Sequence, residues 1–94
     1  MHVPMPEDYQ GFVPVTILLA TQHVEGRVWK FANRRLLQQI EQDKREFVPV
    51  VDAKLFVRDG DEKRLEAEYE VLAIRKSAII AIEPLDCVTQ VAER

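Results

Sequence analysis

Few side chains in this chain could act as nucleophiles or as soft metal ligands. The 94 residues include two histidines, His2 and His23, and one cysteine, Cys87. These residues are far apart in sequence, and no CxxC or HxxxH spacing joins them, so the usual pattern of a zinc site is missing. His23, Asp86 and Cys87 have the residue types of a catalytic triad, but Asp86 and Cys87 are sequence neighbours, and nothing else supports that set. We expect no metal site.

Phosphate and nucleotide chemistry also lacks a scaffold in this sequence. A P-loop or a dinucleotide fingerprint needs several glycines within one short loop, because the backbone must approach the phosphates closely. The three glycines of this chain are isolated from one another: Gly11, Gly26 and Gly60. Since no cluster of titratable residues is available to activate a nucleophile, we expect a protein that is not an enzyme and that uses no cofactor.

Three glutamates alternate along one stretch, at Glu66, Glu68 and Glu70. They could be interpreted as a cation site, but side chains two residues apart on one strand face are too widely spaced to share a small cation. Acidic side chains on an exposed strand also hinder aggregation. We therefore interpret the glutamates as a solvated sheet face.

A basic and aromatic segment is the feature that could best bind another molecule. Between Gly26 and Ile40 the chain has four cations and two aromatic residues but no acid: Arg27, Trp29, Lys30, Phe31, Arg34 and Arg35. Cations beside aromatic rings suit stacked, single-stranded nucleic acid. In the other interpretation, which we favour, Trp29 and Phe31 are core residues and the arginines pair with acids on the following helix or on the acidic strand.

The overall charge and hydropathy narrow the class of protein further. Thirteen Lys and Arg against sixteen Asp and Glu give a net charge of −3, unlike the strongly basic balance of a dedicated nucleic-acid binder. The longest uncharged stretch falls short of the roughly 18 apolar residues that a membrane span needs. The chain opens without the pattern of a signal peptide, and one cysteine forms no internal disulfide, so we expect a cytoplasmic protein that binds no membrane.

Two strands are expected in the first third of the chain. In residues 15–20, β-branched and aliphatic side chains alternate between two faces, which predicts a buried strand. Alternation returns in residues 23–31. Gly26 within that stretch predicts a bulge or bend, which would return Trp29 and Phe31 to the core.

A short helix is expected next. Asn33 is a favourable N-cap, and Leu36, Leu37 and Ile40 share one stripe of a helix of two to three turns. The N3 position carries no Glu or Gln to complete a capping box. The helix must therefore be stabilised mostly by docking its leucine stripe on the sheet.

Three further strands follow the helix. Pro49 cannot donate to a ladder, so it must lie at the start of the third strand or on an edge. A turn at residues 59–61 leads to the clearest one-sided strand of the chain. A last strand is expected over 78–82, and Pro84 prevents it from continuing further. The expected apolar faces are Val51, Ala53, Leu55 and Val57 in the third strand, and Leu65, Ala67, Tyr69, Val71 and Ala73 in the fourth.

These elements predict an α+β fold that is mainly β. Five strands with one short helix after the second favour a strongly bent antiparallel sheet or a small barrel. We place this domain at residues 14–84, between an N-terminal tail of residues 1–13 and a C-terminal tail of residues 85–94 that has a helical spacing. A domain this short buries only about 60 to 65% of its unfolded surface, so we expect a homo-oligomer.

Four features occur in order along the chain: Gly26 in the second expected strand, Arg35 to Leu37 in the short helix, Glu46 to Ala53 with its Phe and Pro, and the isoleucines at 79, 80 and 82. In this arrangement the chain resembles a family of small uncharacterised bacterial domains, in which a glycine in the second strand precedes a short helix rich in Arg and Leu, and a stretch with Phe and Pro then ends in Asp-Ala. The resemblance covers most of residues 15–83 and implies no known activity.

Two further groups of residues form motif-like patterns: Val15, Ile17, Leu19, Gly26 and Val28, and then Ala73, Ile74, Arg75 and Ile79 to Ile82. They are similar to the first and second motifs of Sm-like proteins, a resemblance that implies a small bent barrel with an RNA-contacting arginine. Arg75 takes the place of the RNA-contacting arginine. The chain departs from the family at Lys76, where those proteins carry glycine, in lacking a Met-Asn pair, and in placing a helix between strands two and three.

We expect a non-catalytic protein-interaction module that forms a homo-oligomer by pairing strand edges or by docking the helix face, and an unidentified protein partner is also open. The alternative is an Sm-like protein that binds single-stranded RNA or another oligonucleotide. The surface that would bind nucleic acid or a protein partner comprises Arg27, Trp29, Lys30, Arg34, Arg35 and Arg75.

Overall fold

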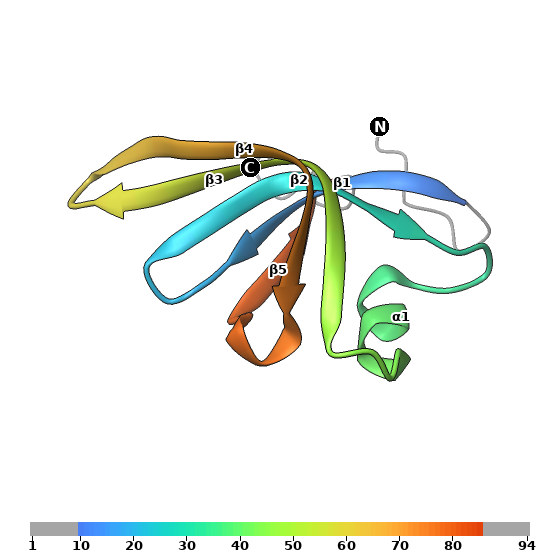
Figure 1. The fold of residues 1–94 in the computed structure, drawn as a ribbon. Helices are drawn as coiled ribbons and strands as arrows, with labels where there is room; N and C mark the ends of the chain where they lie inside the picture. Colours follow the sequence, from blue (N-terminus) through green and yellow to red (C-terminus); the bar gives the residue numbers. More distant parts are fainter. Residues whose placement is uncertain (1–9, 86–94) are drawn as a thin grey trace, which may run out of the picture.

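The computed structural model describes residues 10–85, which form one five-stranded antiparallel sheet with a short helix (Figure 1). The strand order is β4-β3-β2-β1-β5, so the edge strands β4 and β5 do not pair with each other. The sheet is bent and open, which confirms the mainly β class and selects the bent sheet over the closed barrel. The elements are β1 (Gly11–Leu18), β2 (Gln22–Lys30), α1 (Leu36–Gln42), β3 (Phe47–Asp59), β4 (Glu62–Arg75), the 3-10 turn η1 (Lys76–Ala78) and β5 (Ala81–Pro84).

The first strand begins earlier than the sequence pattern indicated. β1 starts at Gly11, and Val13 is almost fully buried, so the assignment of residues 10–13 to a tail was wrong. Pro14 interrupts the apolar pattern but is tolerated, because it lies in the part of β1 that pairs with β2 alone. The expected tail over residues 1–9 and the helical spacing after Leu85 lie outside the described residues.

The sheet bends where β3 crosses β2 at Gly26, as its position within the strand predicted. A Cβ atom at Gly26 would lie 2.5 Å from Val50 Cγ1 and 3.0 Å from the Val51 carbonyl oxygen. The pairing of β2 with β3 shifts register between Glu25 and Arg27, and Asp52 opposite has a positive φ of 51°. β3 and β4 turn sharply here (Figure 1), because only glycine permits so close an approach of two backbones.

The bend also changes which residues of β3 form the core. Ala53 is buried and Leu55 packs against the core, as expected, but before the bend Val48 and Val50 are buried in place of Val51, and Val57 is only partly buried. The extra residue at Asp52 moves the apolar face by one position, as a bulge does. The whole buried cluster comprises Val13, Val15, Ile17, Val24, Val28, Leu36, Val48, Val50, Ala53 and Ile74.

Two expected features of the later strands are confirmed. Gly60 has a φ of 65° in the tight turn between β3 and β4, a left-handed conformation that glycine adopts without a steric cost. Pro49 lies near the start of β3, before the pairing with β2 begins at Val51. Its missing N–H therefore leaves the ladder with β2 intact.

The helix α1 is shorter than expected and docks by a different face. Leu36 is buried and Ile40 packs against the core, but Leu37 is 51% exposed, so its place in the docking stripe was wrong. Asn33 is not the N-cap, because the helix begins after Arg35 and Asn33 takes a left-handed turn with a φ of 62°. The docked stripe consists of Leu36, Gln39 and Ile40 at i, i+3 and i+4, and Leu37, at i+1, lies outside this stripe on the solvent side.

Two polar side chains anchor α1 to the sheet. Gln39 Nε2 donates to the Trp29 carbonyl oxygen at 2.7 Å, and the Phe31 N–H donates to Gln39 Oε1 at 2.7 Å. At the other end of the helix, Lys76 Nζ donates to the carbonyl oxygens of Ile40, at 2.8 Å, and of Asp43. A cation beside the last carbonyls adds hydrogen bonds to these acceptors and is favourable to the C-terminal end of the helix dipole.

Candidate interaction surfaces

The aromatic residues of the basic segment lie on the surface. Trp29 is 38% exposed and Phe31 is 47% exposed, so the expectation that both return to the core was wrong. The reason is that strand alternation continues through Gly26: Val24 and Val28 face the core, and Trp29 therefore points outward. Only the register between strands is disturbed at the bend.

Lys30 points the other way and does not belong to an exposed binding surface. Its side chain is 1% exposed, and Nζ donates to the Phe31 carbonyl oxygen at 3.2 Å. The aliphatic stem of a lysine can pack against apolar neighbours while its amine is satisfied by hydrogen bonds. Lys30 is therefore a structural residue in this fold.

Trp29 belongs to a small exposed cluster on the outer face of β1 and β2. Phe12 pairs with Trp29 across the two strands, and their ring centroids lie 5.0 Å apart in an edge-to-face arrangement. The Arg27 guanidinium lies 5.8 Å from the centre of the Phe12 ring and forms an ion pair with Asp52. We call Phe12, Trp29, Arg27 and Asp52 the outer aromatic cluster.

The remaining cations of the candidate surface are dispersed. Arg34 lies 5.8 Å from the centre of the Phe31 ring, and Arg35 is the N-cap of α1. Arg75, at the end of β4, lies 5.1 Å from the Phe47 ring centre, and its Nη1 lies 3.2 Å from Glu46 Oε1. Of the six residues that the sequence singled out, Arg27 and Trp29 both contact the Phe12 ring, and Arg27 and Arg75 are paired with acids.

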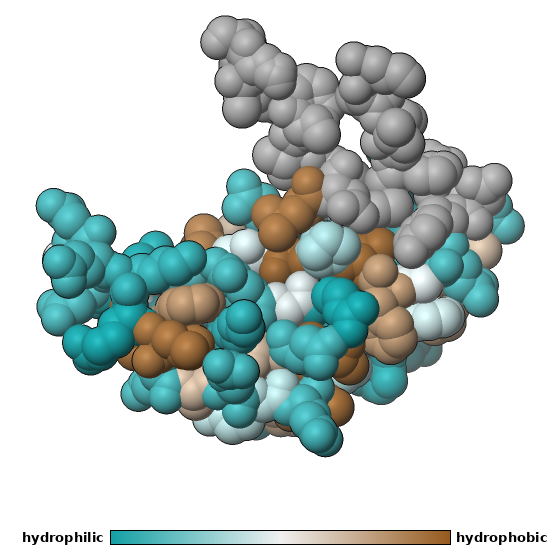
Figure 2. Space-filling model, turned by 90° about the horizontal axis from the view of Figure 1, so that it is seen from above, coloured by the Kyte–Doolittle hydropathy of each residue, from teal (hydrophilic) through white to brown (hydrophobic). Residues whose placement is uncertain are grey.

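The edge strand β4 exposes a face that the sequence predicted to be buried. Tyr69 and Val71 are 42% and 59% exposed, whereas Ile74, which has the opposite parity, enters the core. Leu65 is also exposed, but it lies beyond a register shift in which Glu66 is an extra residue, so it does not share the face of Tyr69 and Val71. The bend explains this correction, because it turns only the C-terminal part of β4 toward the core. Hydrophobic side chains lie among hydrophilic ones on the face seen from above (Figure 2).

β4 is also long for an edge strand. It has 14 residues and pairs with β3 along its length, and among residues 10–85 no strand pairs with its other side. Such an edge presents a row of backbone donors and acceptors to any extended chain. No sequence signal distinguished β4 as an edge, because edge position depends on the strand order.

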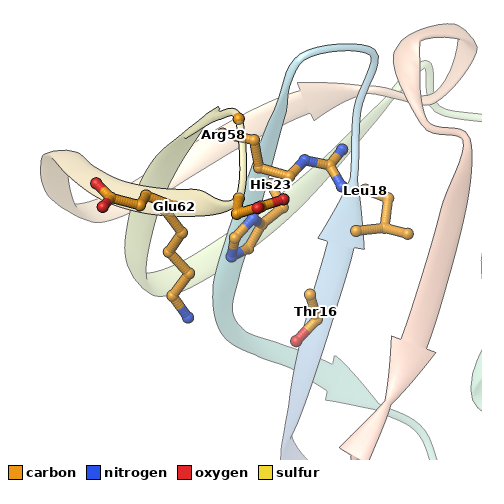
Figure 3. A pocket seen from close by; sticks show the side chains of 8 residues that line it. Thr16, Leu18, His23, Arg58 and Glu62 are labelled. Carbon is orange, nitrogen blue, oxygen red and sulfur yellow. The ribbon is translucent and has the colours of Figure 1, made fainter.

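A shallow hollow of about 250 Å³ lies between the β1–β2 end and the β3–β4 turn (Figure 3). His23 lines this hollow, and its ring stacks on the Phe56 ring with the ring centroids 4.9 Å apart. Glu25 Oε2 lies 3.4 Å from His23 Nε2 and 2.9 Å from Lys63 Nζ. The hydrogen bond from Lys63 is the main cause that lowers the pKa of Glu25. This group is balanced in charge, which favours a structural role.

No protein-family model, curated protein or solved structure matches this chain. Within residues 10–85, no three His, Cys, Asp or Glu side chains lie close enough together to hold a metal ion. In the same part of the chain, no helix has the length and apolar character to cross a membrane.

Proposed function

We propose that this protein is a non-catalytic protein-interaction module that associates with further copies of itself through the free edge of β4. The observation that supports this function is the exposure of alternating apolar residues on a 14-residue edge with which no strand of residues 10–85 pairs. Such an edge, when long and apolar, is a site where strands of another chain add to the sheet.

The composition of β4 supports burial of one side of the strand. Beyond the register shift at Glu66, the side chains of Ala67, Tyr69 and Val71 alternate with Glu68 and Glu70, a pattern typical of a strand that is covered on one face. In the single chain these side chains remain accessible. Cross-strand contacts with a second copy at this edge remove part of this apolar surface from water, which stabilises the association at roughly 25 cal/mol per Å² of apolar area buried.

The other mode of association is docking through the helix face. Leu37 is the exposed apolar residue of α1, but it stands alone on a helix of seven residues. Isolated apolar side chains are common on protein surfaces, whereas a repeated apolar pattern on an unpaired strand is not. The strand edge is therefore the better candidate.

Sedimentation velocity tests this function, with two matched variants. The wild-type chain should sediment at a multiple of 10.9 kDa at micromolar concentration. Tyr69→Asp should shift the equilibrium toward the monomer, because it adds a charge to the apolar edge, and Leu37→Asp should behave as the wild type. A monomeric wild type at high concentration would refute the proposal, and dissociation by Leu37→Asp alone would favour the helix face.

Single-stranded nucleic acid is a second candidate ligand, and the exposure of Trp29 favours it. A base could stack on Trp29 beside Arg27, and such stacking contributes about 1 to 3 kcal/mol per base. The pairing of Arg27 with Asp52 and the net charge of −3 weigh against it. Titration with a labelled oligonucleotide at low salt distinguishes the two functions. Binding that is lost at high salt and in Trp29→Ala would favour nucleic-acid binding over self-association.

A further inference from the structure

We propose that β4 pairs antiparallel with β4 of a second copy across a two-fold axis that passes beside Val71. The two five-stranded sheets would then form one continuous sheet. This inference rests on the proposed self-association and adds to it the partner strand, the symmetry and the register. Three observations on β4 support it: the positions of its charges, the positions of its exposed apolar residues and the position of its bend.

The charges of β4 select the register. When a two-fold axis relates two antiparallel strands, a residue n positions before the central residue of one copy faces the residue n positions after it in the other copy. Like charges that face each other in this way destabilise the pair. Registers centred on residues 66, 68 or 70 oppose a glutamate to its own copy, and centres at 67 or 69 oppose two different glutamates. Centres at 63 or 64 oppose Lys63 or Arg64 to its own copy, and a centre at 65 opposes Glu62 to Glu68.

Centres at residues 71, 72 and 73 avoid every opposition of like charges within β4. A centre at Val71 pairs residues 67–75 of the two copies, which is the longest ladder of the three, since β4 ends at Arg75. A centre at residue 72 pairs only residues 69–75, and a centre at residue 73 pairs only residues 71–75. Backbone hydrogen bonds give strand addition most of its affinity, so the longest ladder is favoured.

The exposed apolar residues of β4 fit the same centre. With the axis at Val71, this side chain, the most exposed apolar one of β4, faces its own copy, and Tyr69 faces Ala73. A centre at residue 72 instead opposes Tyr69 to Arg75, and a centre at residue 73 opposes Val71 to Arg75. Cross-strand pairs of apolar and aromatic side chains stabilise a sheet by about 0.2 to 1 kcal/mol each, so the first register is the favourable one.

The shape of β4 agrees with this position of the axis. Val71 pairs with Val51 and Tyr69 pairs with Ala53, and between these pairs lies Asp52, the residue with positive φ in the bend. β4 follows β3 through this sharp turn (Figure 1). A two-fold axis at the bend places the bends of the two copies side by side, so that both strands curve together. A register centred far from the bend would place a bent segment against a straight one.

Cysteine cross-linking tests the register directly. In a Cys87→Ser background, Val71→Cys places two thiols opposite each other at the axis, within the Cα separation that a disulfide allows. Leu65→Cys is the matched control on the same exposed strand, and in this register its two copies lie about 40 Å apart. We expect mild oxidation to give a covalent dimer for Val71→Cys at least about tenfold faster than for Leu65→Cys.

A second variant tests the same axis without new covalent chemistry. Val71→Lys places two cations opposite each other and should raise the dissociation constant of the dimer about tenfold or more. Because Val71 is exposed in the single chain, the thermal unfolding of the dilute monomer should stay unchanged.

The outcomes separate this register from the self-association on which it rests. A wild-type chain that is monomeric at high concentration would overturn both. Oligomers that persist in Val71→Lys, or that cross-link as readily through Leu65→Cys as through Val71→Cys, would overturn the two-fold axis at Val71 and leave the self-association standing. Dissociation by Val71→Lys together with cross-linking specific to Val71→Cys would support both.

Discussion

Replacement of Gly26 by alanine should destabilise the fold, because the bend of the sheet depends on this residue. The new Cβ would lie 2.5 Å from Val50 Cγ1, where ordinary contacts between carbons begin near about 3.5 Å. Val50 is fully buried, and the Val51 carbonyl oxygen and the Ala53 Cα lie 3.0 Å and 3.3 Å from the same point, so the methyl group displaces backbone as well as side chain.

The magnitude follows from two opposing effects. Inserting a methyl group into a well-packed core costs about 1 to 3 kcal/mol, whereas alanine gains about 0.4 to 1 kcal/mol over glycine by restricting the unfolded chain. The approach of backbone atoms places Gly26→Ala toward the upper end of the cost. We expect a net loss of about 1 to 2 kcal/mol, which lowers the midpoint of thermal unfolding by about 4 to 16 °C in a domain of this size.

Urea and thermal unfolding followed by circular dichroism measure this loss. Val50→Ala is the partner variant, because it removes Cγ1, the atom nearest to the new methyl group. If the contact causes the loss, the double variant should be more stable than the sum of the two single effects predicts, by about 0.5 kcal/mol or more. A Gly26→Ala chain as stable as the wild type, or strictly additive effects with Val50→Ala, would refute the steric explanation.

Three further predictions concern the helix and the acid stability of the fold. Lys76→Met should cost about 1 to 3 kcal/mol in urea unfolding, because it leaves the last carbonyl oxygens of α1 without their charged donor. Leu36→Ala should cost about 2 to 5 kcal/mol, whereas Leu37→Ala should change the stability by less than about 0.5 kcal/mol, and equal losses would contradict the docking of α1. Hydrogen bonds from the Arg45 side chain lower the pKa of the Asp43 carboxyl, so its contribution is present above the ordinary pKa near 4 and is lost as the pH falls below it. Asp43→Asn should therefore weaken the dependence of stability on pH below about pH 4, and an unchanged pH profile would contradict this assignment.

The local patterns of the sequence predicted much of the fold. The alternation through Val24 and Val28, the bend at Gly26 and the turn at Gly60 each depend on residues within a few positions of one another. These features were predicted correctly because a strand's period and a glycine's conformational freedom act locally.

The features that the sequence did not predict depend on contacts between distant segments. Gln39 and Lys76 anchor α1 through partners that are near in space but belong to other elements. Trp29 lies on the surface because β2 keeps its alternation through a bend that disturbs only the register with β3. An apolar pattern such as that of β4 shows that one face is suited to burial, but the covering element can be a second chain.

In the candidate site too, the local sequence pattern identified some residues, whereas the contacts between strands were not predicted. The sequence located Arg27 and Trp29, but it gave no indication that Phe12 pairs with Trp29 or that Asp52 neutralises Arg27, because both contacts join different strands. It also grouped Lys30 with the exposed cations, although strand alternation places Lys30 and Trp29 on opposite faces.

Backbone hydrogen exchange in β4, measured from micromolar to millimolar protein, tests the association through this edge most directly. If further copies pair with β4, the amides of residues 67–75 that point away from β3 should become more protected as the concentration rises, while those of α1 should exchange at a constant rate. Exchange in β4 that does not depend on concentration, in a chain that remains at 10.9 kDa, would contradict the proposed function.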